Sequence, residues 1–250
     1  MRPSGVVALL SDFGATDPYV GMMKGMLLRA HPRSVIIDLL HDVPSQDVAL
    51  GGFFMRAAIG RFPPGTIHMG IVDPGAGPEQ AVLCAYAHGC FWIAPDNGLL
   101  GEVVDGDAEV RLVDLEHLGL TAQSRTFHGR DVFGPLAGML ASGRCGFTSL
   151  GPRTYEIRRV PSLLEGKHRV VHVDNHGNLV TNVPALAIAS VRGLRVAGRL
   201  VPLRGTYADA APGDLVALVN SYDLVEIGEN EGRAAVTLAI GRGAPIELQE

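Results

Sequence analysis

Acidic side chains follow several predicted strands at the point where each strand ends. Asp12 comes after the apolar run VVALLS, Asp73 after IHMGIV and Asp96 after FWIAP, and Asp38 lies near the end of VIIDLL. In open α/β sheets, ligands bind in the crevice outside the carboxyl ends of the strands. Turn preference explains any one of these aspartates, but their recurrence in one structural position favours a binding or catalytic site.

His128 stands in SRTFHGRD, a polar, glycine-containing loop just before a predicted helix. A histidine in such a loop could orient a water molecule or a substrate oxygen and accept a proton. Taken alone, this residue is more simply interpreted as a helix-capping or surface histidine. His41 follows an apolar run in LLHD and could line the same cleft.

A divalent metal held by Asp12, Asp73 and His128 is another possible use of these groups, because carboxylates and histidine suit several ions. The sequence has no DxD or HxH pair to support a metal, and it contains neither the HExxH zinc motif nor the GxxxxGK[ST] phosphate loop. We therefore expect no metal and no cofactor.

In the second half of the chain, HVDNHGNLVTNV predicts a strand, a tight Asn/Gly turn and another strand. Asp174, Asn178 and Asn182 bring hydrogen-bonding groups close to that turn. Such side chains suit a purine edge or an ammonium group, but they also form ordinary Asx turns. The segment alone does not decide between these two interpretations.

The elements that must position these residues change character along the chain. Over residues 1–160, strands are predicted at 6–10, 34–40, 66–72, 81–87, 90–94 and 110–115, and helices at 19–30, 47–59, 99–104 and 131–141. This alternation predicts a mostly parallel α/β sandwich domain. Over residues 167–250, short strands are predicted at 169–174, 179–182, 195–202, 214–218, 224–227 and 234–239, which indicates an antiparallel, β-barrel-like domain.

Composition excludes several classes of protein. The 250-residue chain has 21 basic and 26 acidic residues and no basic stripe, so we expect no nucleic-acid partner. The strongly apolar stretch 132–143, which contains no Asp, Glu, Lys or Arg, is too short to span a membrane. Three cysteines and the absence of a secretory leader predict a cytoplasmic protein with reduced thiols.

Seven segments, in order over nearly the whole chain, resemble the S-adenosylmethionine hydroxide adenosyltransferase family, which is related to the fluorinase and chlorinase enzymes. They are SDFGATDPYVGMMKG (11–25), IIDLLHDVPSQDV (36–48), FPPGTIHMGIVDPGAG (62–77), APDNGLL (94–100), SRTFHGRDVFGPLA (124–137), VDNHGNLVTNV (173–183) and VNSYDLVEIGENEG (219–232). The resemblance implies hydrolysis of S-adenosylmethionine at C5′ to adenosine and methionine. It also implies a homotrimer that binds its ligand between subunits.

The resemblance assigns catalytic roles to two residues. Asp73 and His128 match the aspartate and histidine that activate water in the family, whereas the halogenases have a tyrosine in place of the aspartate and lack the histidine. Gln80 stands where the family has an arginine, so a neutral amide replaces a fixed positive charge. This departure leaves a non-catalytic binder of S-adenosylmethionine or adenosine as one alternative, and a metal-dependent hydrolase as another.

The same resemblance implies the contacts of the substrate. Asp12 should accept the ribose hydroxyls, Phe127 should pack near the adenosine, and Asp174 and Ser221 should bind the amino-acid end of methionine. The remaining assignments concern adenine and two departures from the family. Asn178 should bind the adenine edge with help from the backbone near Glu231. His176 stands where the family usually has a phenylalanine, and Tyr222 stands where the halogenases have an arginine.

Overall fold

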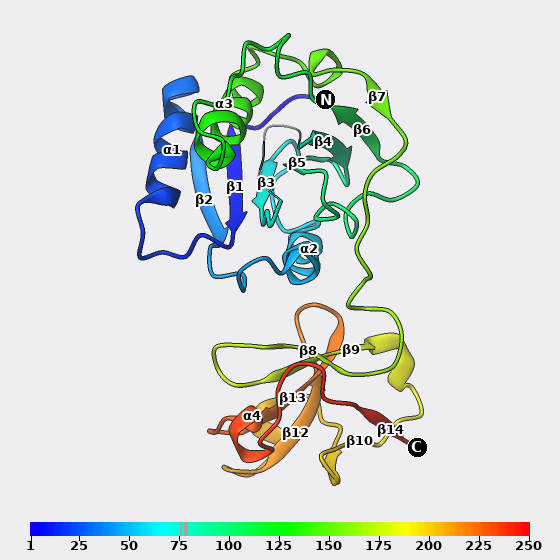
Figure 1. Cartoon of the computed structure of the whole chain (residues 1–250). Helices are drawn as coiled ribbons and strands as arrows, with labels where there is room; N and C mark the ends of the chain where they lie inside the picture. The colour runs from blue at the N-terminus through cyan, green and yellow to red at the C-terminus, as the bar shows by residue number, and fades with distance from the viewer. Residues whose placement is uncertain (76, 78–79) are drawn as a thin grey trace. The chain divides into compact units, whose positions relative to one another are not determined.

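A computed structural model describes all residues of the chain except Ala76, Pro78 and Glu79. The chain divides into two compact units, Met1–Ser162 and Leu163–Glu250 (Figure 1). Each unit has its own sheet or sheets and its own buried hydrophobic residues.

The N-terminal unit is built on a seven-stranded sheet in the order β2-β1-β3-β5-β4-β6-β7. Its strands are β1 (Val6–Ser11), β2 (Val35–Leu40), β3 (Ile67–Ile71), β4 (Val82–Ala87), β5 (Cys90–Pro95), β6 (Glu109–Leu112) and β7 (Arg153–Thr154). The strands β2, β1, β3 and β5 are parallel, whereas β4, β6 and β7 pair in antiparallel fashion. The sheet is therefore mixed.

The hairpin between β4 and β5 explains where the parallel pattern ends. His88 and Gly89 connect the two strands with φ angles of 51° and 74°. Two consecutive residues with positive φ form a turn that reverses the chain between adjacent antiparallel strands. The predicted pairing of these strands through His88-Gly89 is confirmed.

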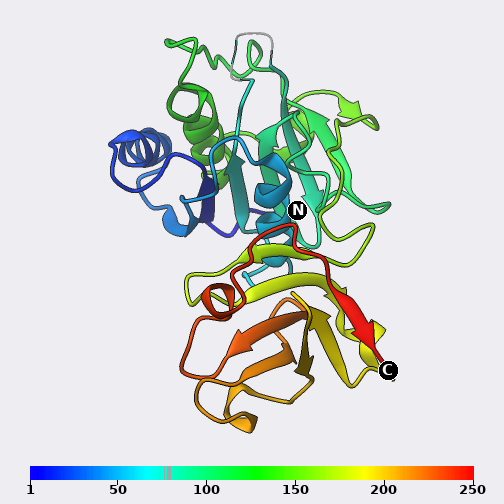
Figure 2. The same ribbon diagram turned by 60° about the horizontal axis from the view of Figure 1, so that its bottom comes forward.

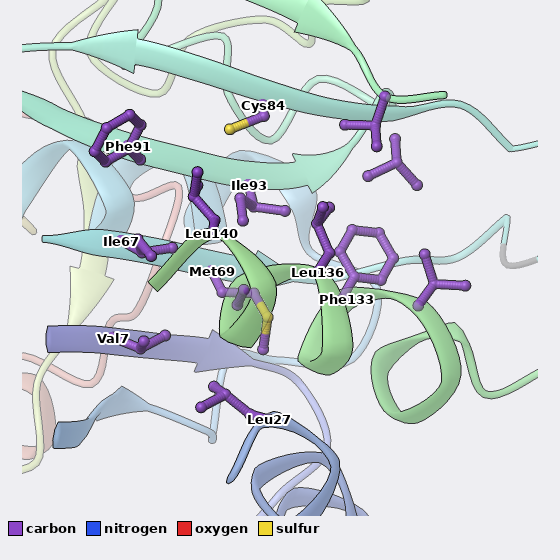
Figure 3. Packing of buried hydrophobic residues seen from close by; sticks show 14 of the residues in the cluster. Val7, Leu27, Ile67, Met69, Cys84, Phe91, Ile93, Phe133, Leu136 and Leu140 are labelled. Atoms are coloured by element: carbon purple, nitrogen blue, oxygen red, sulfur yellow. The ribbon is translucent and has the colours of Figure 1, made fainter. Parts of the chain in front are cut away.

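Helices cover both faces of this sheet because its central strands are apolar on both sides. The helices α1 (Tyr19–Ala30) and α3 (Gly134–Ala141) pack on one face, and α2 (Val48–Ala57) packs on the other. Successive strand residues point to opposite faces, so Phe91 and Ile93 join the core beneath α1 and α3 while Trp92 joins the core beneath α2. Figure 3 shows the first of these cores, where Leu136 and Leu140 of α3 meet the sheet.

The C-terminal unit contains two antiparallel sheets, in the orders β12-β13-β9-β8 and β11-β10-β14 (Figure 2). Its elements are β8 (Val170–Val173), β9 (Leu179–Pro184), β10 (Gly193–Val196), β11 (Arg199–Pro202), β12 (Leu215–Val219), β13 (Leu224–Glu229), α4 (Ala234–Thr237) and β14 (Glu247–Gln249). The antiparallel prediction is confirmed. The barrel-like arrangement is not confirmed, because residues 163–250 as described form no closed sheet.

Three predicted elements differ from the structure. The helix predicted at 99–104 is instead a series of turns over residues 99–103, which follow Gly98, whose φ of 104° lies outside the helical range. Residues 234–239 are not a strand, because Ala234 and Leu238 lie on one buried side of the short helix α4 and its C-cap. The strand predicted at 195–202 is instead the hairpin of β10 and β11, which turns at Ala197-Gly198.

Short helical turns complete the described part of the chain. A π-helix, η1, spans Gly129–Phe133, and 3-10 turns span Phe147–Ser149, Ala185–Ile188 and Tyr207–Asp209. The three cysteines are free and buried. Within the part of the chain that the structure describes, no helix is both long and apolar enough to cross a bilayer.

His68 on β3 is expected to make the N-terminal unit sensitive to acid. Its ring stacks on Trp92 at 4.0 Å, it is 1% exposed, and neither ring nitrogen has a partner among the described residues. Burial lowers the pKa of His68 from 6.5 to about 4. The unfolded chain therefore binds this proton more readily, so stability is complete above pH 6.5 and falls as the pH drops toward 4, by about 3 kcal/mol in total.

His68→Leu should remove this dependence, because an apolar side chain has no proton to bind. Urea unfolding at pH 7 and pH 5 should show the wild type losing about 2 kcal/mol more than the variant between the two conditions. The same change at exposed His117 is the matched control. Equal losses in the wild type and in His68→Leu would contradict the assignment.

Candidate active site

The carboxyl ends of the parallel strands bring the predicted aspartates to one edge of the sheet. Asp12 directly follows β1, Asp73 lies two residues beyond β3, and Asp96 follows β5. Because β1, β3 and β5 are adjacent and parallel, all three residues leave the sheet at the same edge. The sequence pattern therefore located this edge correctly.

Asp73 is held by Gln80, the residue at the position where the family resemblance implies an arginine. Gln80 Nε2 donates a hydrogen bond to Asp73 Oδ1 over 2.7 Å, and the backbone N–H of Gly75 donates to the same oxygen over 3.3 Å. The other amide atom, Gln80 Oε1, is buried and has no partner among the described residues. A neutral amide therefore contacts the carboxylate, and a buried acceptor lies beside it.

His128 is buried against the same edge of the sheet. It is 8% exposed, and its Nε2 atom has no hydrogen-bond partner in the part of the chain that the structure describes. The next residue, Gly129, packs so closely that a Cβ atom there would lie 3.2 Å from Phe13 Cε2 and 3.3 Å from Ile71 Cδ1. The loop that carries His128 therefore lies against the ends of β1 and β3. This position favours a functional histidine over a surface histidine.

Asp131, which no sequence motif had indicated, fixes this loop. Its carboxylate is almost fully buried and accepts hydrogen bonds from Arg130 Nε over 2.7 Å and from the backbone N–H of Ser124 over 2.7 Å. The hydrogen bonds from Arg130 hold the pKa of Asp131 below its usual value. The π-helix η1 begins beside this contact, as single π-turns often do at functional sites. In the sequence, the adjacent Arg130 and Asp131 shortly after His128 were the pattern that could have indicated this contact.

Phe127 lies in an aromatic cluster beside His128. Its ring meets Phe13 edge-on at a centroid distance of 5.9 Å and Tyr19 at 5.3 Å, and the Arg130 guanidinium lies 5.1 Å from its centroid. Partly buried rings of this kind offer a flat apolar surface to a ligand. The cluster is compatible with the predicted contact of Phe127 with adenosine.

Asp12 holds the loop that precedes α2. Its Oδ2 atom accepts a hydrogen bond from the backbone N–H of Gln46 over 2.9 Å, and Gln46 has a φ of 67°. The carboxylate is only half-buried and lies at the edge of the sheet. The remaining acceptor capacity of a carboxylate suits the hydroxyl groups of a ligand.

A chain of side chains braces the segment before Asp12. Ser11 Oγ lies 2.7 Å from His41 Nδ1, and His41 Nε2 lies 2.9 Å from Asp38 Oδ1. Lys24 Nζ donates to Asp38 Oδ2 over 2.6 Å. Burial raises the pKa of Asp38, but the hydrogen bonds from Lys24 and His41 outweigh it and hold that pKa below its usual value. His41 and Asp38 therefore form a structural chain behind the candidate site.

Asp96 also has a structural partner. Its Oδ1 atom accepts a hydrogen bond from the backbone N–H of Arg158 over 2.8 Å. The neighbouring Asn97 donates from Nδ2 to the carbonyl of Val72 over 2.8 Å and so supports the turn that leads to Asp73. Of the strand-end aspartates, Asp12 and Asp73 remain the candidates for chemistry.

Most of the binding residues predicted in the C-terminal unit line one cavity of about 390 Å³. They are Asp174, His176, Asn178, Ser221 and Tyr222. Glu231 is exposed in a turn after β13 with a φ of 58°, and it is not among the described lining residues.

The same cavity is lined by Tyr207 and Glu226, which the sequence analysis did not identify. Burial and the neighbouring Glu226 raise the pKa of Tyr207. Burial, followed by Glu226 and Asp174, also raises the pKa of Tyr222. Both phenols are therefore neutral hydrogen-bonding groups near pH 7. No local sequence pattern identifies Glu226 as a binding residue, because its role depends on hydrogen bonds to side chains that are distant in the sequence.

Asp12, Asp73 and His128 do not form a metal site in the described structure. Among the described residues, no group of three or more His, Cys, Asp or Glu side chains is arranged to hold a metal ion.

Comparison with known proteins identifies the family. A model of the SAM hydroxide adenosyltransferase N-terminal domain matches residues 7–151, and a model of the C-terminal domain of the same family matches residues 168–247. The chain belongs to the SAM hydroxide adenosyltransferase family. Its two compact units correspond to the two matched domains of this family.

Relatives in the SAM hydroxide adenosyltransferase family match almost the whole chain. A protein from Thermus thermophilus named (R)-S-adenosyl-L-methionine hydrolase is 34% identical over 99% of this chain and 100% of its own length. A protein of the same name from Salinispora arenicola is also 34% identical and covers 97% of both chains. A crystal structure of an uncharacterized conserved protein from Thermotoga maritima matches with a TM-score of 0.86 and 28% identity, covering 97% of this chain and 99% of its own.

Proposed function

We propose that this protein hydrolyses S-adenosyl-L-methionine at C5′ and releases adenosine and L-methionine. Membership of the SAM hydroxide adenosyltransferase family supports this function. So does 34% identity, over nearly the full length, to two proteins named (R)-S-adenosyl-L-methionine hydrolase. The observation within the structure that carries the proposal is a set of polar groups near one strand end, Asp73 with Gln80 and the buried, unpartnered His128 Nε2.

The chemistry requires an activated nucleophile more than an activated leaving group. The sulfonium makes methionine leave as a neutral molecule, so no general acid is needed. Water is a weak nucleophile because its pKa is about 15.7. We assign to Asp73 and His128 the tasks of orienting one water molecule in line with the C5′–S bond and accepting its proton.

The buried polar atoms support this assignment. Buried polar atoms normally have hydrogen-bond partners, so an exception calls for an explanation. His128 Nε2 and Gln80 Oε1 are two such atoms, and Gln80 also contacts Asp73. A water molecule or substrate atom that binds between these residues would satisfy them.

We assign the remaining substrate contacts to both units of the chain. Asp12 accepts the ribose hydroxyls and Phe127 packs against the adenosine. In the C-terminal unit, Asp174 and Ser221 bind the amino-acid end. Three further residues of the C-terminal cavity complete the proposal: Asn178 and His176 for adenine, and Tyr222 beside the methionine carboxylate. The backbone near Glu231 is assigned to the adenine edge on the family resemblance alone.

The decisive experiment is incubation of the purified protein with S-adenosyl-L-methionine in ¹⁸O-labelled water, followed by chromatography and mass spectrometry. Attack of water on C5′ places the label in the 5′-hydroxyl of adenosine and leaves methionine unlabelled. Binding of S-adenosylmethionine without adenosine formation above the uncatalysed rate would instead identify a non-catalytic binder. Loss of activity after chelation, with recovery on addition of one metal ion, would identify a metal-dependent hydrolase.

The family resemblance also supports a homotrimer with shared sites. We propose that the N-terminal unit of one copy and the C-terminal unit of a neighbouring copy together form each site. Light scattering should then give three times the 26.4 kDa mass of one chain, or a multiple of that value. Co-expression of Asp73→Asn and Asn178→Ala chains should restore activity, because mixed trimers contain some intact sites. A fully active monomer would contradict the shared site.

Gln80→Arg is expected to raise turnover. Gln80 already contacts Asp73 at 2.7 Å, so an arginine that reaches the same oxygen would place a fixed positive charge beside the carboxylate and the forming hydroxide. The measurement is kcat for adenosine formation, with Gln80→Met as the matched control for side-chain length without hydrogen bonding. Equal kcat values for wild type and Gln80→Arg would show that the charge is not used in this protein.

A further inference from the structure

The C-terminal cavity contains a hydrogen-bonded chain whose direction is set by the backbone. The backbone N–H groups of Tyr222 and Leu224 donate to Asn220 Oδ1 over 2.9 and 3.3 Å. This fixes the amide of Asn220, so its Nδ2 atom donates to Glu226 Oε2 over 3.0 Å. Glu226 is 6% exposed.

The chain continues from Glu226 to Asn178 through Tyr207. Glu226 accepts from Asn220 at one oxygen, and the Tyr207 hydroxyl donates to the other, Oε1. The Tyr207 oxygen is then left to accept, and Asn178 Nδ2 donates to it over 3.2 Å. The raised pKa of Tyr207 keeps this hydroxyl protonated near pH 7.

Asp174 accepts the other hydrogen of the Asn178 amide. Asn178 Nδ2 donates to Asp174 Oδ2 over 3.0 Å, and the Asn178 backbone N–H donates to Asp174 Oδ1 over 2.8 Å. A carboxamide nitrogen has two hydrogens, and both are now used within the protein. The carbonyl oxygen of Asn178 is therefore the amide group that remains for a ligand.

We infer that Tyr207 and Glu226 are positioning residues that fix the Asn178 amide, and that the site thereby selects a 6-aminopurine over a 6-oxopurine. The amino group of adenine donates to a carbonyl oxygen, whereas the 6-oxo group of hypoxanthine presents a second acceptor that would leave both atoms unpaired. The inference rests on the proposed function, because it takes the ligand of Asn178 to be the adenosyl group. It adds residues that the family resemblance does not assign.

The packing around Tyr207 supports this arrangement independently. A Cβ atom on Gly228 of β13 would lie 2.5 Å from Tyr207 Cε1 and 3.1 Å from Asn178 Oδ1. Glycine at this position therefore allows the phenol ring to reach the amide. Asn178, Tyr207 and Glu226 all line the 390 Å³ cavity, so the fixed amide lies where a ligand can bind.

The test compares the affinities of full-length protein for adenosine and inosine by calorimetry. The wild type should bind adenosine about tenfold or more tightly than inosine, since an unpaired buried polar group carries a penalty of that order. Tyr207→Phe frees one amide hydrogen, so the ratio should fall to about threefold or less. Tyr155→Phe is the matched control, because Tyr155 is 82% exposed, and it should keep the wild-type ratio.

The ratio separates positioning from a general structural role, since a loosened site would lose affinity for both nucleosides equally. If Tyr207→Phe does not fold, Glu226→Gln provides the second test. Because Asn220 Nδ2 can only donate, the side-chain oxygen of the new glutamine would accept from Asn220, and its amide nitrogen would donate to Tyr207. The Tyr207 hydroxyl would then donate toward Asn178, so the ratio of adenosine to inosine affinity should fall in this variant too.

Two results would overturn the inference while leaving the hydrolase proposal intact. They are a wild-type ratio near one, and an unchanged ratio in a folded Tyr207→Phe or Glu226→Gln variant. Absence of binding for both nucleosides in the wild type would remove the proposed function and this inference together.

Discussion

Asp73→Asn is expected to lower kcat for adenosine formation by about 10²–10⁴-fold with little change in the affinity for S-adenosylmethionine. The asparagine keeps the size of the side chain and an oxygen that Gln80 can contact, but it cannot accept a proton from water. His128→Ala should lower kcat in the same manner. Single-turnover kinetics together with calorimetric affinities would measure both quantities.

Asp96→Asn is the matched control for Asp73→Asn. Asp96 also follows a parallel strand of the same sheet, but its carboxylate accepts a hydrogen bond from the backbone of Arg158, which an asparagine oxygen can still accept. We expect this variant to keep the wild-type kcat. A normal kcat in Asp73→Asn would show that another group activates the water.

Asp12→Ala is expected to weaken adenosine binding by about 1.5–3 kcal/mol, or roughly ten- to 150-fold, since hydrogen bonds to a charged group contribute this much. Calorimetry with adenosine and 2′,3′-dideoxyadenosine isolates the ribose contact. The wild type should bind the dideoxy compound much more weakly than adenosine, whereas Asp12→Ala should bind the two almost equally.

Because Asp12 also accepts from the backbone of Gln46, the alanine variant removes a structural contact as well. Asp12→Asn keeps an oxygen for Gln46 and removes the charge, so it serves as the second variant. A folded Asp12→Ala protein that still distinguishes the two nucleosides as the wild type does would refute the ribose assignment.

The sheet edge that carries Asp12 and Asp73 could be predicted from the sequence because its position depends on local patterns. Short apolar runs such as Val6–Ser11 and Ile67–Ile71 alternate with helical patterns, and this alternation is read within windows of about a dozen residues. Parallel strands then place the residues that follow them at one edge. The location of Asp12 and Asp73 follows from these two facts together.

Local patterns failed where the surroundings decide between two structures that the same residues could form. Residues 234–239 are apolar and short enough for a strand, yet Ala234 and Leu238 are buried on one side of a helical turn. The reversal at His88-Gly89, in contrast, was predicted from the local sequence, and it places β4 beside β5 and ends the parallel pattern.

Side-chain pairs that are distant in the sequence were decided only by the tertiary structure. Asn178 and Tyr207 are 29 residues apart, and Tyr207 and Glu226 are 19 residues apart. Periodicity identifies the buried face of a strand, but it carries no information about which side chain lies opposite on a distant segment. The sequence alone therefore identified Asp73, His128 and Asn178 as candidate site residues. The partners that orient Asn178 and contact Asp73 depend on how the sheets and turns pack.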